Sequence, residues 1–134
     1  MNPDKDAAEI RNVVLQVFKN WSSMNPETND SCYLADSKTV LFDINPMQDI
    51  GWATQKERLH GVFQVFEFFK MEPNDDLAVH FLGDLAWATT TWKYELRLKN
   101  GQRLQHEGRG TFVLQRQEGK WLVVHDHISR PVVD

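Results

Sequence analysis

The residue best suited to proton transfer is Asp126, in the triplet His125-Asp126-His127 near the end of the sequence. Alternation along a strand places it on one face with apolar residues: Leu122, Val124 and Ile128. If that face is buried, loss of water disfavours the charged carboxylate and raises its pKa, which suits a general acid or base near neutral pH. The alternative is an Asp126 that forms a salt bridge with Arg109 and only satisfies a polar pocket floor.

Three short turns decide which residues can join Asp126. Gly83-Asp84, Asn100-Gly101 and Glu118-Gly119 are each expected to form a two-residue hairpin turn, which needs residues that accept positive φ. Pairing outward from the turns predicts four pairs on one face: Trp92 with Arg109, Tyr94 with Glu107, Thr111 with Asp126, and Arg109 with Ile128. The sequence therefore predicts a polar and aromatic cluster on one face of an antiparallel sheet.

Arg109 is the second candidate catalytic residue of this cluster. Its guanidinium could stack on Trp92 and stabilise oxyanion charge on a carbonyl ligand while Asp126 moves a proton. The alternative is a structural arginine paired with Glu107 or Asp126. The predicted substrate-binding residues are Trp92, Tyr94, Thr111, Glu107, Trp52 and Ile128, with Trp52 as a lid on the loop that follows Gly51.

The predicted pairing divides the sheet residues into two faces, and a β-bulge would reverse part of the division. The inner face is expected to carry Val79, Phe81, Ala86, Ala88, Thr90, Trp92, Tyr94, Glu107, Arg109, Thr111, Val113, Leu122, Val124, Asp126 and Ile128. The outer face is expected to carry His80, Leu82, Trp87, Thr89, Thr91, Lys93, Glu95, His106, Phe112, Leu114, Arg116, Trp121, Val123, His125 and His127.

Other reactive residue types give weaker signals. Tyr33, Asp43 and Trp52 fall in segments that would rim a pocket, but ordinary packing or turn chemistry is the favoured reading. A metal site is disfavoured, because alternation puts His125 and His127 on the face opposite Asp126 and no ligand spacing typical of zinc occurs. No glycine-rich nucleotide motif is present, so no cofactor is expected.

Helical and strand patterns supply the elements that must position these residues. Helical spacing of apolar residues predicts helices over 4–22 and 54–71, with a short helix reaching Tyr33 and Leu34. A strand is expected over 39–44, and four consecutive antiparallel strands after Pro73. Helices on one face of such a sheet make an α+β domain, and a curved sheet around a helix leaves a conical cavity.

Length and composition narrow the class of protein. The 134 residues predict one domain, 1–134, and the formal net charge of -4 without a basic cluster argues against nucleic-acid binding. No apolar run is long enough to span a membrane, and no export leader is expected. The single cysteine, Cys32, has no nucleophilic context and fits a reducing compartment, so a cytoplasmic location is expected.

Three motifs, spread over most of the chain, together resemble a known family. They are the ending GKWLVVHDHISRP at 119–131, Arg109-Gly110-Thr111 on the preceding strand, and Asp43-Ile44-Asn45-Pro46 followed by Gly51-Trp52. With the element order, they resemble the SnoaL-like, ketosteroid-isomerase-like branch of the nuclear transport factor two superfamily. That resemblance implies a cone-shaped α+β fold, a homodimer, and one pocket per subunit for a hydrophobic or carbonyl-containing molecule.

Two functions remain open on this basis. One is a pocket protein, an isomerase, cyclase or lyase without a nucleotide cofactor, with Asp126 as acid–base group and Arg109 as oxyanion donor. The other is a non-catalytic ligand-sensing or assembly domain, since the ending also resembles the association domain of calcium/calmodulin-dependent kinase II. Trp87, Phe112, His125 and His127 would then form a subunit contact on the convex face of the sheet.

Overall fold

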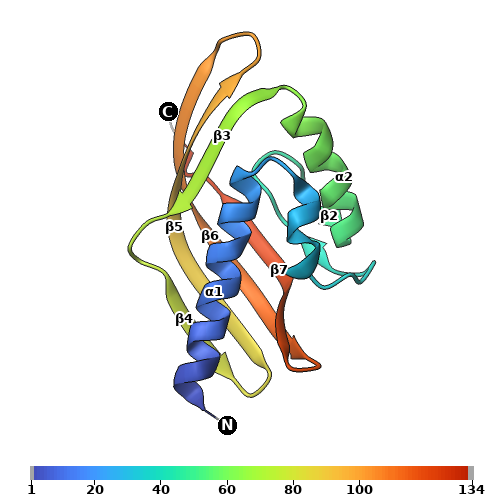
Figure 1. The fold of residues 1–134 in the computed structure, drawn as a ribbon, viewed down its shortest axis with the longest axis vertical. Coiled ribbons are helices and arrows are strands. Elements are labelled where there is room, and N and C mark those ends of the chain that lie inside the picture. The colour runs from blue at the N-terminus through green and yellow to red at the C-terminus, as the bar shows by residue number, and fades with distance from the viewer. Residues whose placement is uncertain (1, 133–134) are drawn as a thin grey trace.

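A long helix lies across a curved antiparallel sheet in the computed structural model, which describes residues 2–132 (Figure 1). The elements are α1 (Pro3–Ser22), the 3-10 helix η1 (Pro26–Ser31), β1 (Val40–Leu41), β2 (Asp49–Ile50), α2 (Trp52–Phe63), β3 (Phe66–Pro73), β4 (Ala78–Leu82), β5 (Leu85–Leu98), β6 (Arg103–Gln117) and β7 (Lys120–Ser129). The strand order of the main sheet is β3-β5-β6-β7, with β4 also paired to β5. The α+β architecture and the curved sheet expected from the sequence are therefore present.

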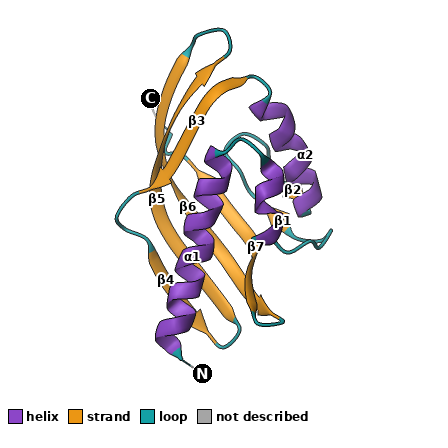
Figure 2. Ribbon diagram, in the orientation of Figure 1, coloured by secondary structure: helices purple, strands orange, loops and turns teal. Residues whose placement is uncertain are grey.

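Helix α1 begins and packs as its sequence predicts. The Asn2 side chain caps it by accepting hydrogen bonds from the backbone N–H groups of Asp4 and Lys5, at 3.1 and 3.2 Å. Its apolar stripe is buried against the sheet: Ile10, Val14, Val17, Phe18 and Trp21. Figure 2 shows α1, η1 and α2 together on one side of the sheet. None of the helices within residues 2–132 is long and apolar enough to cross a bilayer.

The helix predicted over 54–71 is wrong in its second half. Helix α2 ends at Phe63, and Phe66–Pro73 forms strand β3, paired with β5. An irregularity between Phe66 and Phe68 gives this strand a spacing of three between inward residues, so Phe66, Phe69 and Met71 imitate a helical pattern. Pairing with β5, far along the chain, overrides that local signal.

Two of the three predicted turns are confirmed, and the third is one residue longer. Leu82 pairs with Leu85 and Gln117 with Lys120, so each of those turns holds two residues. Between β5 and β6, however, Leu98 donates its N–H to Gln102 at 2.8 Å, leaving three residues in the turn, Lys99 to Gly101. Trp92 consequently lies opposite Gly108, and Tyr94 opposite His106, one position away from the predicted partners Arg109 and Glu107.

A β-bulge shifts the next pairing by one residue as well. Leu114 pairs with Val123 and Val113 pairs with His125, so Val124 is an extra residue in β7. Beyond the bulge, Thr111 lies opposite His127 and Arg109 opposite Ser129, where the sequence predicted Asp126 and Ile128.

The longer turn exchanges the predicted faces of β6 and of β7 as far as Val123, and the bulge then returns Asp126 and Ile128 to the predicted inner face. The faces of β5 are as predicted. The residues that face the core from β6 and β7 are Gly108, Gly110, Phe112, Leu114, Trp121, Val123, Asp126 and Ile128. Glu107, Arg109, Thr111 and Val113 point to the outer face, against the prediction, whereas Phe112, Leu114, Trp121 and Val123 were wrongly expected there. His125 and His127 do lie on the face opposite Asp126.

Candidate functional site

The centre of the candidate site is the pair formed by Asp126 and Tyr33. Strand β7 carries Asp126 inward, and the segment after η1 joins β7 through hydrogen bonds from Leu34 N to Val123 O (2.9 Å) and from Val123 N to Cys32 O (2.8 Å). This junction brings the Tyr33 hydroxyl to Asp126, where it donates to Oδ2 at 2.6 Å. Both side chains are buried, with exposed fractions of 2% for Tyr33 and 0% for Asp126.

The surroundings of Asp126 favour its uncharged form. Burial raises its pKa to about 8; the Tyr33 hydrogen bond opposes this, while the negative charges of Asp43 and Asp49 add to it. Burial and the neighbouring Asp126 also raise the pKa of Tyr33 well above its usual value, so the phenol stays protonated. Asp126 is consequently a protonated acid at neutral pH.

The second oxygen of Asp126 is free to act on another group. Oδ1 is buried and has no hydrogen-bond partner among residues 2–132. Because Tyr33 donates to Oδ2, the proton of the neutral carboxyl belongs on Oδ1. The arrangement can therefore present a hydrogen-bond donor from Oδ1 while Tyr33 fixes the other oxygen.

A charged triad lies next to this pair. Arg58 of α2 donates from Nη2 to Asp43 Oδ2 at 2.7 Å and to Asp49 Oδ2 at 2.9 Å, and from Nε to both oxygens of Asp49 at 3.0–3.1 Å. Asp43 follows β1, and Asp49 belongs to β2, so the triad connects α2 to the small two-stranded sheet. The charges of all three residues act on Asp126, which places the triad within electrostatic reach of the buried acid.

An apolar cavity of about 110 Å³ begins at the triad. Asp43, Asn45 and Arg58 form its polar end, while apolar and aromatic side chains make up the rest of the wall: Trp21, Ile44, Leu59, Val62, Phe63, Phe66, Phe69, Met71, Tyr94, Leu96 and Ile128. Ile128 lies two residues after Asp126 on the same face of β7. The interior thus offers an apolar compartment with carboxyl groups gathered at one end.

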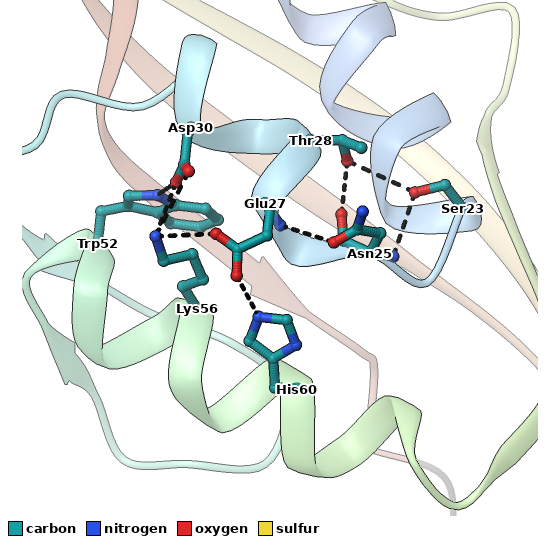
Figure 3. Close-up of polar contacts among 8 residues, drawn as sticks. All are labelled: Ser23, Asn25, Glu27, Thr28, Asp30, Trp52, Lys56 and His60. Carbon is teal, nitrogen blue, oxygen red and sulfur yellow. Dashed lines mark hydrogen bonds and ion pairs between the residues drawn. The ribbon is translucent and has the colours of Figure 1, made fainter.

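Trp52 packs on Tyr33, the hydrogen-bond partner of Asp126, instead of forming a lid over the pocket. It is the first residue of α2, not a loop residue as predicted, and its ring stacks on Tyr33 with centroids 4.4 Å apart. Figure 3 shows the indole Nε1 donating to Asp30, at 2.7 Å. Lys56 bridges Asp30 and Glu27, and His60 contacts Glu27 at 2.6 Å, so the same helix face fastens α2 to η1.

Three of the predicted binding residues face the interior. Tyr94 and Ile128 line the cavity, and Trp92 is fully buried behind them, stacked on Tyr94 at 5.6 Å. Trp92 lies against Gly108, where an added Cβ would come within 2.2 Å of its ring. A glycine on β6 is therefore what allows Trp92 to lie flat across the sheet.

The other three predicted residues of the cluster lie apart from Asp126. Arg109, Glu107 and Thr111 are on the outer face because of the longer turn before β6, and the bulge in β7 directs Asp126 to the opposite, inner face. Arg109 donates from Nε to Ser129 Oγ at 3.0 Å. Glu107 lines a separate open groove of about 700 Å³, where charges of both signs alternate: Lys70, Glu72, Lys93, Glu95, Glu107 and Arg130. No group of metal-ligating side chains occurs within the described part of the chain, residues 2–132.

Sequence reasoning missed Arg58 and Asp49 and assigned Tyr33 and Asp43 to ordinary packing. The available signal was the Asp43-Ile44-Asn45-Pro46 and Gly51-Trp52 motif, because it brackets Asp49 and ends where α2 begins. Arg58 follows six residues after Trp52 on the first two turns of that helix, a position that no pairing rule for the sheet could reach.

Comparison with known proteins identifies the family. A model of the SnoaL-like domain matches residues 14–133, so the chain belongs to the SnoaL-like family. No curated protein sequence matches the chain significantly.

Solved structures share the fold at low sequence identity. A nuclear transport factor 2-like superfamily protein from Salmonella enterica is 20% identical, with a TM-score of 0.91 over 98% of this chain and 95% of the other. A proposed dehydratase of the same family from Streptomyces avermitilis is 16% identical, with a TM-score of 0.86 over 98% and 100%. A proposed calcium/calmodulin-dependent protein kinase II association domain from Xanthomonas campestris is 23% identical, with a TM-score of 0.72 over 88% and 85%. These likenesses establish the fold, which hosts different activities.

Proposed function

We propose that this protein binds a small, mainly apolar molecule bearing a carbonyl group and moves a proton on it, in an isomerase- or cyclase-type reaction. The observation that carries the proposal is Asp126, a fully buried acid with a pKa of about 8 and a free Oδ1, next to an apolar cavity. A general acid is most effective when its pKa lies near the working pH.

The proposed step uses two carboxyl groups with opposite protonation. Asp126 gives its Oδ1 proton to the carbonyl oxygen, while the Asp43 carboxylate, held by Arg58, takes a proton from the carbon next to that carbonyl. With an unsaturated ketone the product of this step is a dienol. Asp43 then returns its proton to a different carbon, while the enol hydroxyl gives its proton back to Asp126, which restores the carbonyl and completes an isomerisation. Tyr33 stabilises the Asp126 carboxylate that remains after transfer.

Access to Asp126 is a requirement of this proposal. Asp126 is fully buried and does not line the cavity, so side chains of the cavity wall must move aside before a ligand can reach it. Arg58 replaces Arg109 as the cationic residue of the site, because Arg109 lies on the opposite face of the sheet.

A ligand screen followed by a turnover assay tests the proposal. Single-ring ketones, then larger polyketide-like aromatics and steroids, are tested for a melting shift, since a ligand at a hundred times its Kd adds about 2.7 kcal/mol of stability. With a ligand that is turned over, Asp126→Asn should lower kcat by about 10² or more, as expected for loss of an acid–base group. Asp75→Asn, at an exposed loop position, is the matched control. Unchanged turnover in Asp126→Asn would end the proton-transfer proposal.

A second candidate function is assembly through the outer face, supported by the apolar side chains exposed there. Trp87 is 42% exposed and stacks on His80 at 5.3 Å, and Leu82 and Leu85 are 81% and 49% exposed nearby. Phe112, predicted to join this contact, is fully buried and cannot. We propose a homodimer through this face, which light scattering of wild type and Trp87→Asp would test; a wild-type monomer at micromolar concentration would refute it.

We also propose a cytoplasmic location, supported by the lone cysteine, Cys32, which is buried and unpaired. Fractionation of cells that express the tagged protein would test it.

A further inference from the structure

We infer that the carbonyl compound taken by the cavity is uncharged or cationic, that it also carries a hydroxyl or ammonium group that donates to Asp43, and that the cavity rejects carboxylates. This inference rests on the proposed ligand cavity and specifies the class of molecule that it accepts. It follows from the charge, direction and size of the cavity's polar end.

The polar end carries a net negative charge. Two carboxylates, Asp43 and Asp49, surround the single guanidinium of Arg58, at contact distances of 2.7–3.1 Å. Asp49 is itself buried, and it occupies both Nε and Nη2 of Arg58. Because the arginine is already outnumbered, an incoming carboxylate would add a third negative charge in a site partly shielded from water.

The Asp43 carboxylate points toward the interior. It lines the cavity, and its exposed fraction is only 22%. Its charge reaches groups on three separate segments: after burial, which is the main cause, Asp43 adds to the raised pKa of Tyr33, Tyr94 and Asp126. A ligand that enters the cavity therefore meets the carboxyl oxygens of Asp43 as acceptors at its polar end.

The nearest other cation does not cancel this charge inside the cavity. Arg130 hydrogen-bonds the Tyr94 side chain, but it lines the open groove and is not part of the cavity wall. Lys70 and Lys93 likewise line that groove, together with Glu72 and Glu95. Arg130, Lys70 and Lys93 thus belong to the open groove and do not line the cavity.

The size of the cavity limits the apolar part of the ligand. Its volume is about 110 Å³, and an apolar cavity of about 150 Å³ is known to hold benzene. The apolar part of the ligand is therefore no larger than a single ring, with its polar group directed toward Asp43.

A matched series of single-ring compounds tests the inference. Benzylamine, benzyl alcohol, benzoate and toluene are titrated into wild-type protein by calorimetry at pH 7 and low salt. We expect benzylamine to bind most tightly and benzoate at least about tenfold more weakly than benzyl alcohol, a difference of about 1.4 kcal/mol. Equal or tighter binding of benzoate overturns the charge selectivity while leaving the cavity proposal intact. Failure of all four, toluene included, overturns the ligand cavity itself.

Variants test whether the charge selectivity comes from the Asp43 carboxylate. Asp43→Asn should weaken the binding of benzylamine by about tenfold and reduce the ratio of its affinity to that of benzoate. Asp75→Asn should change neither the affinity for benzylamine nor this ratio. If Asp43→Asn is unfolded by circular dichroism, the salt dependence of benzylamine binding to wild type replaces it. Affinity should then fall with rising salt, because screening weakens the attraction between unlike charges, and a salt-independent affinity would contradict the inference.

Discussion

Tyr33 and Asp126, 93 residues apart in the chain, share a 2.6 Å hydrogen bond inside the protein. The bond joins the segment after η1 to β7 and leaves one carboxyl oxygen committed and the other free. Burial keeps the acid protonated at neutral pH, and the tyrosine is the group that most favours its ionised form. Burial and the tyrosine thus act on the pKa of Asp126 in opposite directions, and burial has the larger effect.

The raised pKa of Asp126 predicts a distinct pH dependence of stability. Between the unfolded value near 4 and the folded value of about 8, the folded protein holds a proton that the unfolded chain releases. Asp126 therefore makes stability fall as pH rises through this range, by up to about 1.4 kcal/mol per pH unit. Asp126→Asn removes this contribution. Urea unfolding at pH 5, 6, 7 and 8 should show that the free energy of unfolding of the variant rises relative to that of wild type with each increase in pH.

The difference between the two proteins is the quantity to follow, because other titrating groups contribute equally to both. Asp75→Asn, which alters an exposed carboxylate, should keep a constant offset from wild type. A constant offset for Asp126→Asn as well would mean that Asp126 titrates like an ordinary carboxyl.

Removing the Tyr33 hydroxyl should raise the pKa of Asp126 further. The hydrogen bond from Tyr33 stabilises the ionised carboxylate, so Tyr33→Phe withdraws the largest effect that opposes burial. We also expect a loss of about 1–3 kcal/mol of stability, since Oδ2 is left buried without a donor. The carboxyl ¹³C shift of Asp126 measures the titration. Tyr94→Phe, whose hydroxyl contacts Arg130, is the comparison, and a downward shift in Tyr33→Phe would contradict the assignment.

Trp52 should stabilise the fold through two separable contacts. Trp52→Phe keeps a ring against Tyr33 but loses the bond from the indole Nε1 to Asp30, at a cost of about 1–2 kcal/mol. Trp52→Ala also loses the stacked ring and leaves a void, at a cost of about 3–5 kcal/mol. Chemical denaturation measures both. Met47→Ala, at a loop position whose side chain is 94% exposed, should change stability by less than about 0.5 kcal/mol, and an equal loss there would show that the Trp52 effects are not specific.

Two glycines with opposite surroundings form a matched pair. Gly108→Ala would push a methyl group to 2.2 Å from the Trp92 ring and 2.4 Å from the Ser129 carbonyl oxygen, so we expect a loss of about 3 kcal/mol or more. Gly61→Ala, in α2 with no atom within 4 Å of the new methyl, should instead add up to about 1 kcal/mol. Thermal unfolding of both variants tests this. Similar effects of the same sign would mean that Trp92 does not lie against Gly108.

Much of the fold could be read from local sequence patterns. The apolar stripe of α1 and the turns at Gly83-Asp84 and Glu118-Gly119 depend on neighbouring residues only, and the structure confirms them. Asp126 is fully buried on β7, whereas the pairing predicted around it is wrong. Local rules hold where an element is decided by its own residues.

The composition of the site depended on longer-range relations. One additional residue in the turn before β6 moves Arg109 to the outer face, one in β7 keeps Asp126 on the inner face, and neither has a clear sequence signature. Tyr33 and Asp43 lie in or next to segments that bridge to β7 over long sequence distances, and Arg58 reaches Asp43 from α2. Such contacts are determined by the assembled fold and not by any local pattern.

The extra residue of the bulge, Val124, is a position at which β7 could lose one residue and keep its pairing with β6. Pairing on each side of the bulge is regular, with Leu114 opposite Val123 and Val113 opposite His125. Deleting Val124 would therefore join two stretches that are already in the same register with β6. Every later side chain of β7, Asp126 included, would still point to the same face of the sheet. Loss of a residue elsewhere in β7 would move the side chains of part of the strand to the opposite face of the sheet. Among related sequences, a gap opposite Val124 is thus compatible with an intact site, whereas a gap two positions later is not.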